Sequence, residues 1–218
     1  MNKLTLTIAA LASASLTAFS QGQVGFDNTY ANGYVIESDA SHTASSANTY
    51  VQAADFTAQL WALSGPTTTV PADVDSYGYI SPLLLTTDGF SLVAGSTTIG
   101  SAGAFSAAVN EIVPGTVSGN TVLAVVAWSG EWANLATAIA NGAQIGALAF
   151  VNPVGPASPT PYSGDISTGW NALQNSPLSS ANSGNEDLIL TSVPEPTSLA
   201  LAGLGGFGML MALRRKQA

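Results

Sequence analysis

Residues 121–128 read Thr-Val-Leu-Ala-Val-Val-Ala-Trp, an apolar run that begins with a single hydroxyl side chain. Successive side chains of a strand point to opposite faces of a sheet, so this run would be apolar on both faces. Such a pattern is expected of a strand in the centre of a sheet. The run therefore predicts a central strand and a β fold.

A second strand is predicted at residues 56–63, Phe-Thr-Ala-Gln-Leu-Trp-Ala-Leu. The period of two places every second residue from Phe56 to Ala62 on one apolar face. The opposite face begins polar at Thr57 and turns apolar at Trp61. Gly65-Pro66 is a turn signal and is expected to end the strand.

Short apolar stretches separated by Gly, Pro and Asn recur along the rest of the chain. They predict further strands at 24–26, 105–110, 143–150 and 187–191. Several short strands with turn signals between them indicate a mainly β fold. We expect a single antiparallel β-sandwich over residues 21–192, of jelly-roll or immunoglobulin-like type.

One segment has a helical period instead. Apolar residues recur at helical spacing between Glu131 and Ala140, which predicts one short helix crossing between two strands. The charge of Glu131 suits the start of a helix, and Asn141-Gly142 suits a left-handed exit. The apolar positions are Trp132, Leu135, Ala136 and Ile139.

Two stretches are predicted to be long loops. Residues 38–48 are mostly Ser, Ala and Thr, and residues 152–185 are rich in Pro, Ser, Asn and Gly. Loops of this length are uncommon in compact domains and are either functional or mobile.

Charge is distributed unevenly along the chain. All four basic residues lie outside residues 21–192, while only Glu195 of the 13 acidic residues does, which leaves this body at about −12. A phosphate backbone would be repelled, so nucleic-acid binding is not expected. The chain has no cysteine, so its stability must come from a hydrophobic core, and its length suits one domain.

The N-terminus has the pattern of a secretory signal peptide over residues 1–20. Lys3 is followed by an apolar stretch and then by small residues at Ala18 and Ser20. Signal peptidase is expected to cleave between Ser20 and Gln21.

The C-terminus has the pattern of a membrane anchor. Residues 197–213 are uncharged and just long enough to span a bilayer as a helix. The cluster that follows fixes the basic end in the cytoplasm and the body outside, and it consists of Arg214, Arg215 and Lys216.

Residues 193–218 closely resemble a PEP-CTERM sorting domain. Pro194, Glu195 and Pro196 precede the uncharged run, and the basic cluster ends it. The resemblance implies that an exosortase recognises Pro194, Glu195 and Pro196, and that the basic cluster retains the chain. It also implies an exported protein of a Gram-negative bacterium, anchored in the inner membrane as an intermediate and then placed on the cell surface or in the matrix. An ordinary membrane anchor is the alternative.

The body also resembles a group of PEP-CTERM surface proteins with a recurring layout. The shared cues are residues 56–61, Gly103-Ala104-Phe105 with Val113-Pro114-Gly115, and Val126-Ala127-Trp128 before a helix. This resemblance implies a β-sandwich without an assigned activity.

Catalytic patterns are weak. A catalytic triad would have to use His42, the only histidine, and no Gly-x-Ser-x-Gly motif accompanies any serine. Zinc would lack ligands, because the chain has one His and no Cys. Paired carboxylates leave a polysaccharide hydrolase open, but we expect no enzymatic activity.

Calcium is the metal that the carboxylates fit best. Asp73 and Asp75 offer hard oxygen ligands at alternate positions, with Gly78 at the sixth place of an EF-hand-like loop. The twelfth place holds Leu84 rather than Glu, so that loop form fails. A looser site using Asp73, Asp75 or the Glu186-Asp187 pair stays open; no other cofactor is expected.

Tryptophan faces stack on sugar rings, and the chain has four tryptophans. Trp128 and Trp132 are expected in the core, because large aromatics dominate core burial. Trp61 and Trp170 are the candidates for exposure and for glycan contact.

These observations predict an exported surface or matrix protein with a structural or adhesive role, linked to exopolysaccharide or biofilm. A carbohydrate-binding module using Trp61 and Trp170 is the second hypothesis, and a polysaccharide-active hydrolase is the third.

Overall fold

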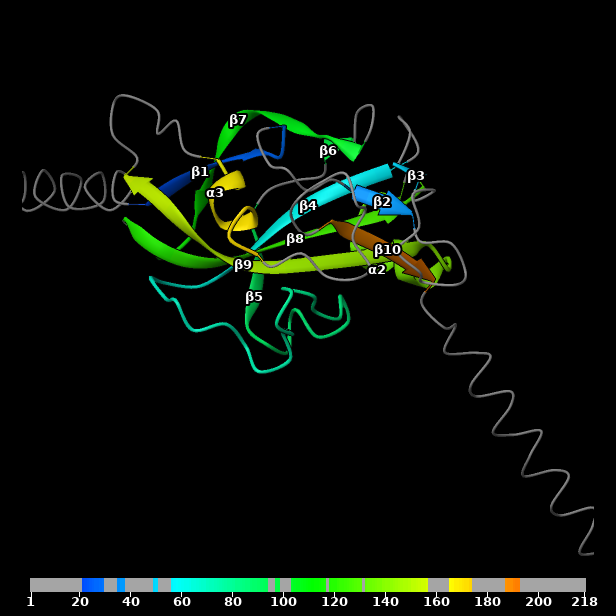
Figure 1. Cartoon of the computed structure of the whole chain (residues 1–218), viewed down its shortest axis with the longest axis horizontal. Coiled ribbons are helices and arrows are strands. Elements are labelled where there is room, and N and C mark those ends of the chain that lie inside the picture. Colours follow the sequence, from blue (N-terminus) through cyan, green and yellow to red (C-terminus); the bar gives the residue numbers. More distant parts are fainter. Residues whose placement is uncertain are drawn as a thin grey trace, which may run out of the picture.

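The computed structural model describes residues 21–29, 35–37, 49–50, 56–93, 97–98, 103–116, 118–130, 132–156, 165–173 and 187–192. Within these residues the chain is mainly β, as predicted (Figure 1). The elements are β1 (Gly22–Asp27), β2 (Val35–Glu37), β3 (Thr49–Tyr50), β4 (Phe56–Leu63), β5 (Phe90–Leu92), β6 (Thr97–Thr98), β7 (Ser106–Val113), β8 (Gly119–Ser129), α2 (Leu135–Ala140), β9 (Gln144–Pro156), α3 (Ser167–Trp170) and β10 (Leu188–Ser192).

Strand β8 is the centre of the sheet, as its apolar run predicts. It pairs antiparallel with β4 on one side and with β9 on the other, so that Val125 lies opposite Leu60 and Leu148. Each residue from Thr121 to Trp128 is buried. The predicted strand at residues 56–63 is confirmed with the same bounds.

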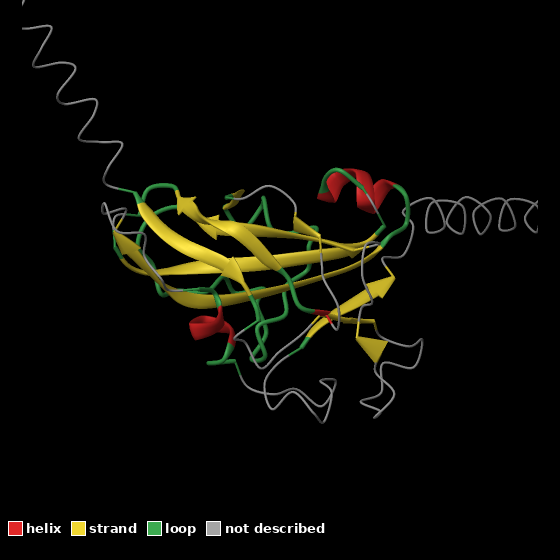
Figure 2. Ribbon diagram, turned by 90° about the horizontal axis from the view of Figure 1, so that it is seen from above, coloured by secondary structure: helices red, strands yellow, loops and turns green. Residues whose placement is uncertain are grey.

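The sheet is strongly curled, because the long strand β9 has different partners at its two ends (Figure 2). Ser192 of β10 lies opposite Gln144 at its start, and Gly22 of β1 lies opposite Pro156 at its end. Strand β1 continues the curl by pairing with β7. The strands join into one ten-stranded sheet, so a two-sheet sandwich is not confirmed. One pairing, between β10 and β2, is parallel.

Both faces of β8 carry a hydrophobic core, which explains its unbroken apolar sequence. The inner core, on the concave face, receives Leu123, Val125 and Ala127. The outer core, on the opposite face, receives Val122, Ala124, Val126 and Trp128.

The outer core is covered by the long connection between β4 and β5, residues 64–89, and by α2. This connection crosses the sheet to β9, where the Ile80 N–H donates to the Ala147 carbonyl and the Ala149 N–H donates to the Gly78 carbonyl. Leu85, which is 1% exposed, packs in this core. The connection therefore acts as a second layer without being a second sheet.

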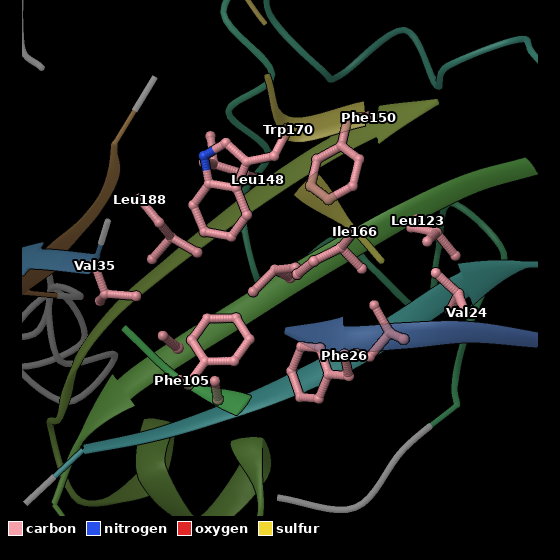
Figure 3. Packing of buried hydrophobic residues seen from close by; sticks show 14 of the residues in the cluster. Val24, Phe26, Val35, Phe105, Leu123, Leu148, Phe150, Ile166, Trp170 and Leu188 are labelled. Carbon is pink, nitrogen blue, oxygen red and sulfur yellow. The ribbon is translucent and has the colours of Figure 1, made fainter. Parts of the chain in front are cut away.

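The inner core is closed by β1, β7 and α3 (Figure 3). The rings of Phe26 and Phe105 lie with their centroids 4.8 Å apart. Figure 3 shows the indole of Trp170 among Leu148 and Phe150. Burying large aromatic rings of this kind contributes much of the driving force for folding.

The predicted helix is confirmed as α2, but it begins later than expected. Asn134 is its N-cap: its side chain accepts a 2.9 Å hydrogen bond from the Thr137 N–H, so a polar cap replaces the charge of Glu131. The exit is as predicted, with Gly142 at φ 68°.

The second predicted loop is wrong over part of its length. Strand β9 continues to Pro156, and residues 165–173 include α3. Asn152 holds these parts together, because its Oδ1 accepts the Gly169 N–H and its Nδ2 donates to the Asp165 carbonyl. The remainder of that loop and all of residues 38–48 lie outside the described residues.

Both predicted targeting segments also lie outside the described residues, namely residues 1–20 and the span at 197–213. In the part of the chain that the structure describes, no helix has the length and apolar character needed to cross a membrane.

Candidate functional site

The tryptophans are arranged differently from the sequence prediction. Trp170 was a candidate for exposure, but it is fully buried, because α3 folds back over the inner core. Its ring centroid lies 6.0 Å from that of Phe150 and 6.4 Å from that of Phe105. Trp170 therefore cannot stack on a sugar in this fold. The prediction that Trp128 belongs to the core is confirmed.

Trp132 was expected in the core and is instead 37% exposed. The reason is the late start of α2, which leaves Trp132 in the turn between β8 and the helix. Its backbone carbonyl accepts a 3.2 Å hydrogen bond from the buried Trp128 Nε1. A Cβ on Gly130, whose φ is +89°, would come within 2.6 Å of the Trp132 Nε1. The exposed indole is therefore held closely against the end of β8.

Trp61 is partly buried and reaches the surface beside an exposed aliphatic residue. It packs against the outer core and lies opposite Leu92 of β5, which is 47% exposed. The Trp61 Nε1 is buried without a hydrogen-bond partner among the residues that the structure describes. This pair forms a small apolar surface at the sheet edge.

The two candidate calcium ligands have different surroundings. The Asp75 Oδ1 accepts hydrogen bonds from the backbone N–H groups of Tyr77 and Tyr79, each 2.9 Å long, so it serves its own turn. Asp73 lies beside Asp88 instead. Asp187, of the alternative pair, is fully buried. Within the described residues, no three His, Cys, Asp or Glu side chains come together as metal ligands do.

The pKa of Asp88 is raised above its ordinary value by loss of hydration and then by the neighbouring charge and side chain of Asp73. The Asp88 Oδ2 has no hydrogen-bond partner within the described part of the chain. The folded state thus binds the carboxyl proton of Asp88 more tightly than the unfolded chain does. Ionisation of Asp88 therefore opposes folding.

We therefore expect Asp88→Asn to raise the melting temperature at pH 7. The gain should shrink as the pH falls and vanish once both states are protonated, below the ordinary value of 3.8. Thermal unfolding between pH 3 and pH 7 measures this. Asp73→Asn should act in the same direction, and a melting temperature unaltered at pH 7 in both variants would contradict the coupling.

Asp27 and Asn28, which the sequence analysis did not single out, fix β1 to the segment before β7. The fully buried Asn28 accepts from the Phe105 N–H at 2.6 Å and donates from Nδ2 to the Gly103 carbonyl. Burial opposes ionisation of Asp27, but hydrogen bonds from Thr29 and Ser106 outweigh it and lower its pKa. In the sequence, the only indication of this polar anchor was an Asp-Asn pair at the end of an alternating strand.

The sorting candidates can be placed only by the strand that precedes them. Pro194, Glu195, Pro196 and the basic cluster lie outside the described residues, as do Ser20 and His42, while Gln21 lies just before β1. Strand β10 ends at Ser192, and its inner residues Leu188 and Leu190 are fully buried. The C-terminal segment therefore starts directly at a strand that is packed into the sheet.

Comparison with known proteins agrees with this division of the chain. The PEP-CTERM protein-sorting motif matches residues 192–216. No match was found among the curated proteins or the solved structures. The motif implies an exosortase as processing partner, a transient membrane anchor and sorting to the surface. The chain therefore contains a PEP-CTERM protein-sorting motif, and this motif supports an exported protein that is sorted by an exosortase.

Proposed function

We propose that this protein has a structural or adhesive, non-enzymatic role at the cell surface or in an extracellular matrix, in association with exopolysaccharide. The observation that supports the proposal best is the sorting motif at residues 192–216, which begins at the last residue of β10. The acidic, cysteine-free body adds to it, because a net charge of about −12 keeps an exported domain soluble.

The proposed route has two processing steps. Signal peptidase removes residues 1–20, and residues 197–213 then hold the chain in the inner membrane with Arg214, Arg215 and Lys216 on the cytoplasmic side. Exosortase recognises Pro194, Glu195 and Pro196 and passes the body on to the surface.

Glu195→Ala tests this route. We expect the variant to accumulate in the membrane fraction with its tail uncut, whereas most of the wild-type chain reaches the surface or medium. Fractionation of cells followed by immunoblotting measures both location and size. The matched control is Glu186→Ala, which removes an acid just before β10 and should behave like the wild type. Equal distribution of both variants would refute recognition through Glu195.

A carbohydrate-binding body is the second candidate, and one observation favours it. Trp61 and Leu92 form a partly exposed apolar surface at the sheet edge, where an indole could stack on a sugar ring. This candidate now rests on Trp61 without Trp170. It requires that the emission of Trp61 respond to a polysaccharide.

A further inference from the structure

The end of the sheet from which the sorting motif leaves is well defined. Ser192 lies opposite Gln144, whose N–H donates to the Ser129 Oγ at 2.9 Å, and Ser129 lies opposite Phe56. These four residues mark one end of β10, β9, β8 and β4, and we call it the Ser192 end. In Figure 1, α2 and the tip of β10 lie at this same end.

The tether between this end and the proposed membrane span is short. Thr197 follows Ser192 by five residues, and an extended chain covers at most about 3.6 Å per residue, or roughly 18 Å in all. As long as the chain is anchored, Ser192 itself must therefore lie within that distance of the span, and the rest of the Ser192 end lies close by. This step rests on the anchored stage of the proposed function.

The Ser192 end carries an exposed tryptophan. Trp132 lies just beyond β8, 37% exposed and held against Gly130. From Trp132 through α2 to Gln144 the chain carries no charge, although Glu131 directly precedes it. The uncharged parts of an acidic body are the parts that an anionic phospholipid surface repels least. Indole rings also favour the headgroup region of a bilayer.

We propose that the Ser192 end rests on the bilayer while the chain is anchored, with the Trp132 indole in the phospholipid headgroup region. The contact is weak by itself, because a single indole is buried. The tether raises its effective concentration enough for it to form. Contact at this end sets the orientation of the body and holds the sorting motif at the membrane surface.

The test uses the full chain reconstituted into phosphatidylcholine vesicles that contain brominated lipid. Brominated lipids quench only tryptophans that contact them. We expect quenching of up to about a quarter of the emission, since Trp132 is one of four tryptophans. Trp132→Phe should abolish this quenching, while the control Trp61→Phe should retain it.

Flotation of the vesicles separates the two proposals. A chain that does not float with the vesicles contradicts the anchored stage itself. A chain that floats but is quenched equally with and without Trp132 overturns only the contact proposed here. So does a Trp132 emission that responds to a soluble neutral polysaccharide but not to brominated lipid, because the exposed indole would then serve sugar binding.

Discussion

Trp170→Ala is expected to lower the free energy of unfolding by about 3–5 kcal/mol, the usual cost of removing a buried aromatic ring. The indole is fully buried and packs against Phe105 and Phe150, which come from separate parts of the chain. Its loss leaves a cavity where α3 closes the inner core. Urea denaturation followed by circular dichroism measures the change, and the midpoint should fall while the slope stays constant.

Trp132→Ala is the matched control, because it removes the same side chain from the surface. Its cost should be a small fraction of that at Trp170, since Trp132 is 37% exposed. Equal losses of stability in the two variants would mean that α3 does not hold Trp170 in the core. Together the variants also test whether Trp170 is the buried and Trp132 the exposed tryptophan, contrary to the sequence prediction.

Gly146→Ala is expected to lower the free energy of unfolding by about 1–3 kcal/mol, because it overpacks the contact between β9 and β10. A Cβ at this position would overlap the Ile189 carbonyl oxygen and approach the Leu188 Cδ2 to 3.0 Å. Strand β10 must shift away from β9. Hydrogen exchange of the β10 amides should then accelerate more than that of the β8 amides.

Gly65→Ala provides a comparison with a different physical origin. Gly65 has φ +84° and nothing within 4 Å of a new Cβ, so only backbone strain is added, at about 1–2 kcal/mol. It should leave the exchange of β10 unaltered. If Gly146→Ala had no larger effect on β10 than Gly65→Ala, the close approach of Gly146 to Ile189 would be refuted.

The strands were predictable because their signal is local. The alternation of side chains between two faces predicts β4 from Phe56 to Leu63. The run that is apolar on both faces predicts β8 as the central strand. What covers β8 was not predictable in the same way. The connection at residues 64–89 is rich in turn residues, so its sequence gives no sign that it covers the core. Its hydrogen bonds to β9, which is distant in sequence, place it over the sheet, where Leu85 fills the outer core. The curl likewise depends on β1 and β10 sharing β9.

The tryptophans show the limit of local pattern most clearly. Trp170 stands among Ser, Gly and Asn residues, which are typical of a loop, and its aromatic partners are remote in sequence. Trp132 stands at helical spacing, but the Asn134 cap starts the helix after it. The sorting motif was readable because its pattern lies in one short contiguous segment of the sequence.

The pairing of β1 and β10 with opposite ends of β9 bears on the order of maturation. Strand β9 has 13 residues, so Gly22 and Ser192 are separated by roughly 40 Å along it. In the proposed route, signal peptidase acts before Gln21 and the chain is then tethered to the membrane beyond Ser192. If the Ser192 end rests on the bilayer and β9 is directed away from it, the folded body holds Gln21 far from the membrane. The proposed contact therefore favours signal cleavage before β1 joins the sheet, so that closure of the curl at β1 would separate export from sorting.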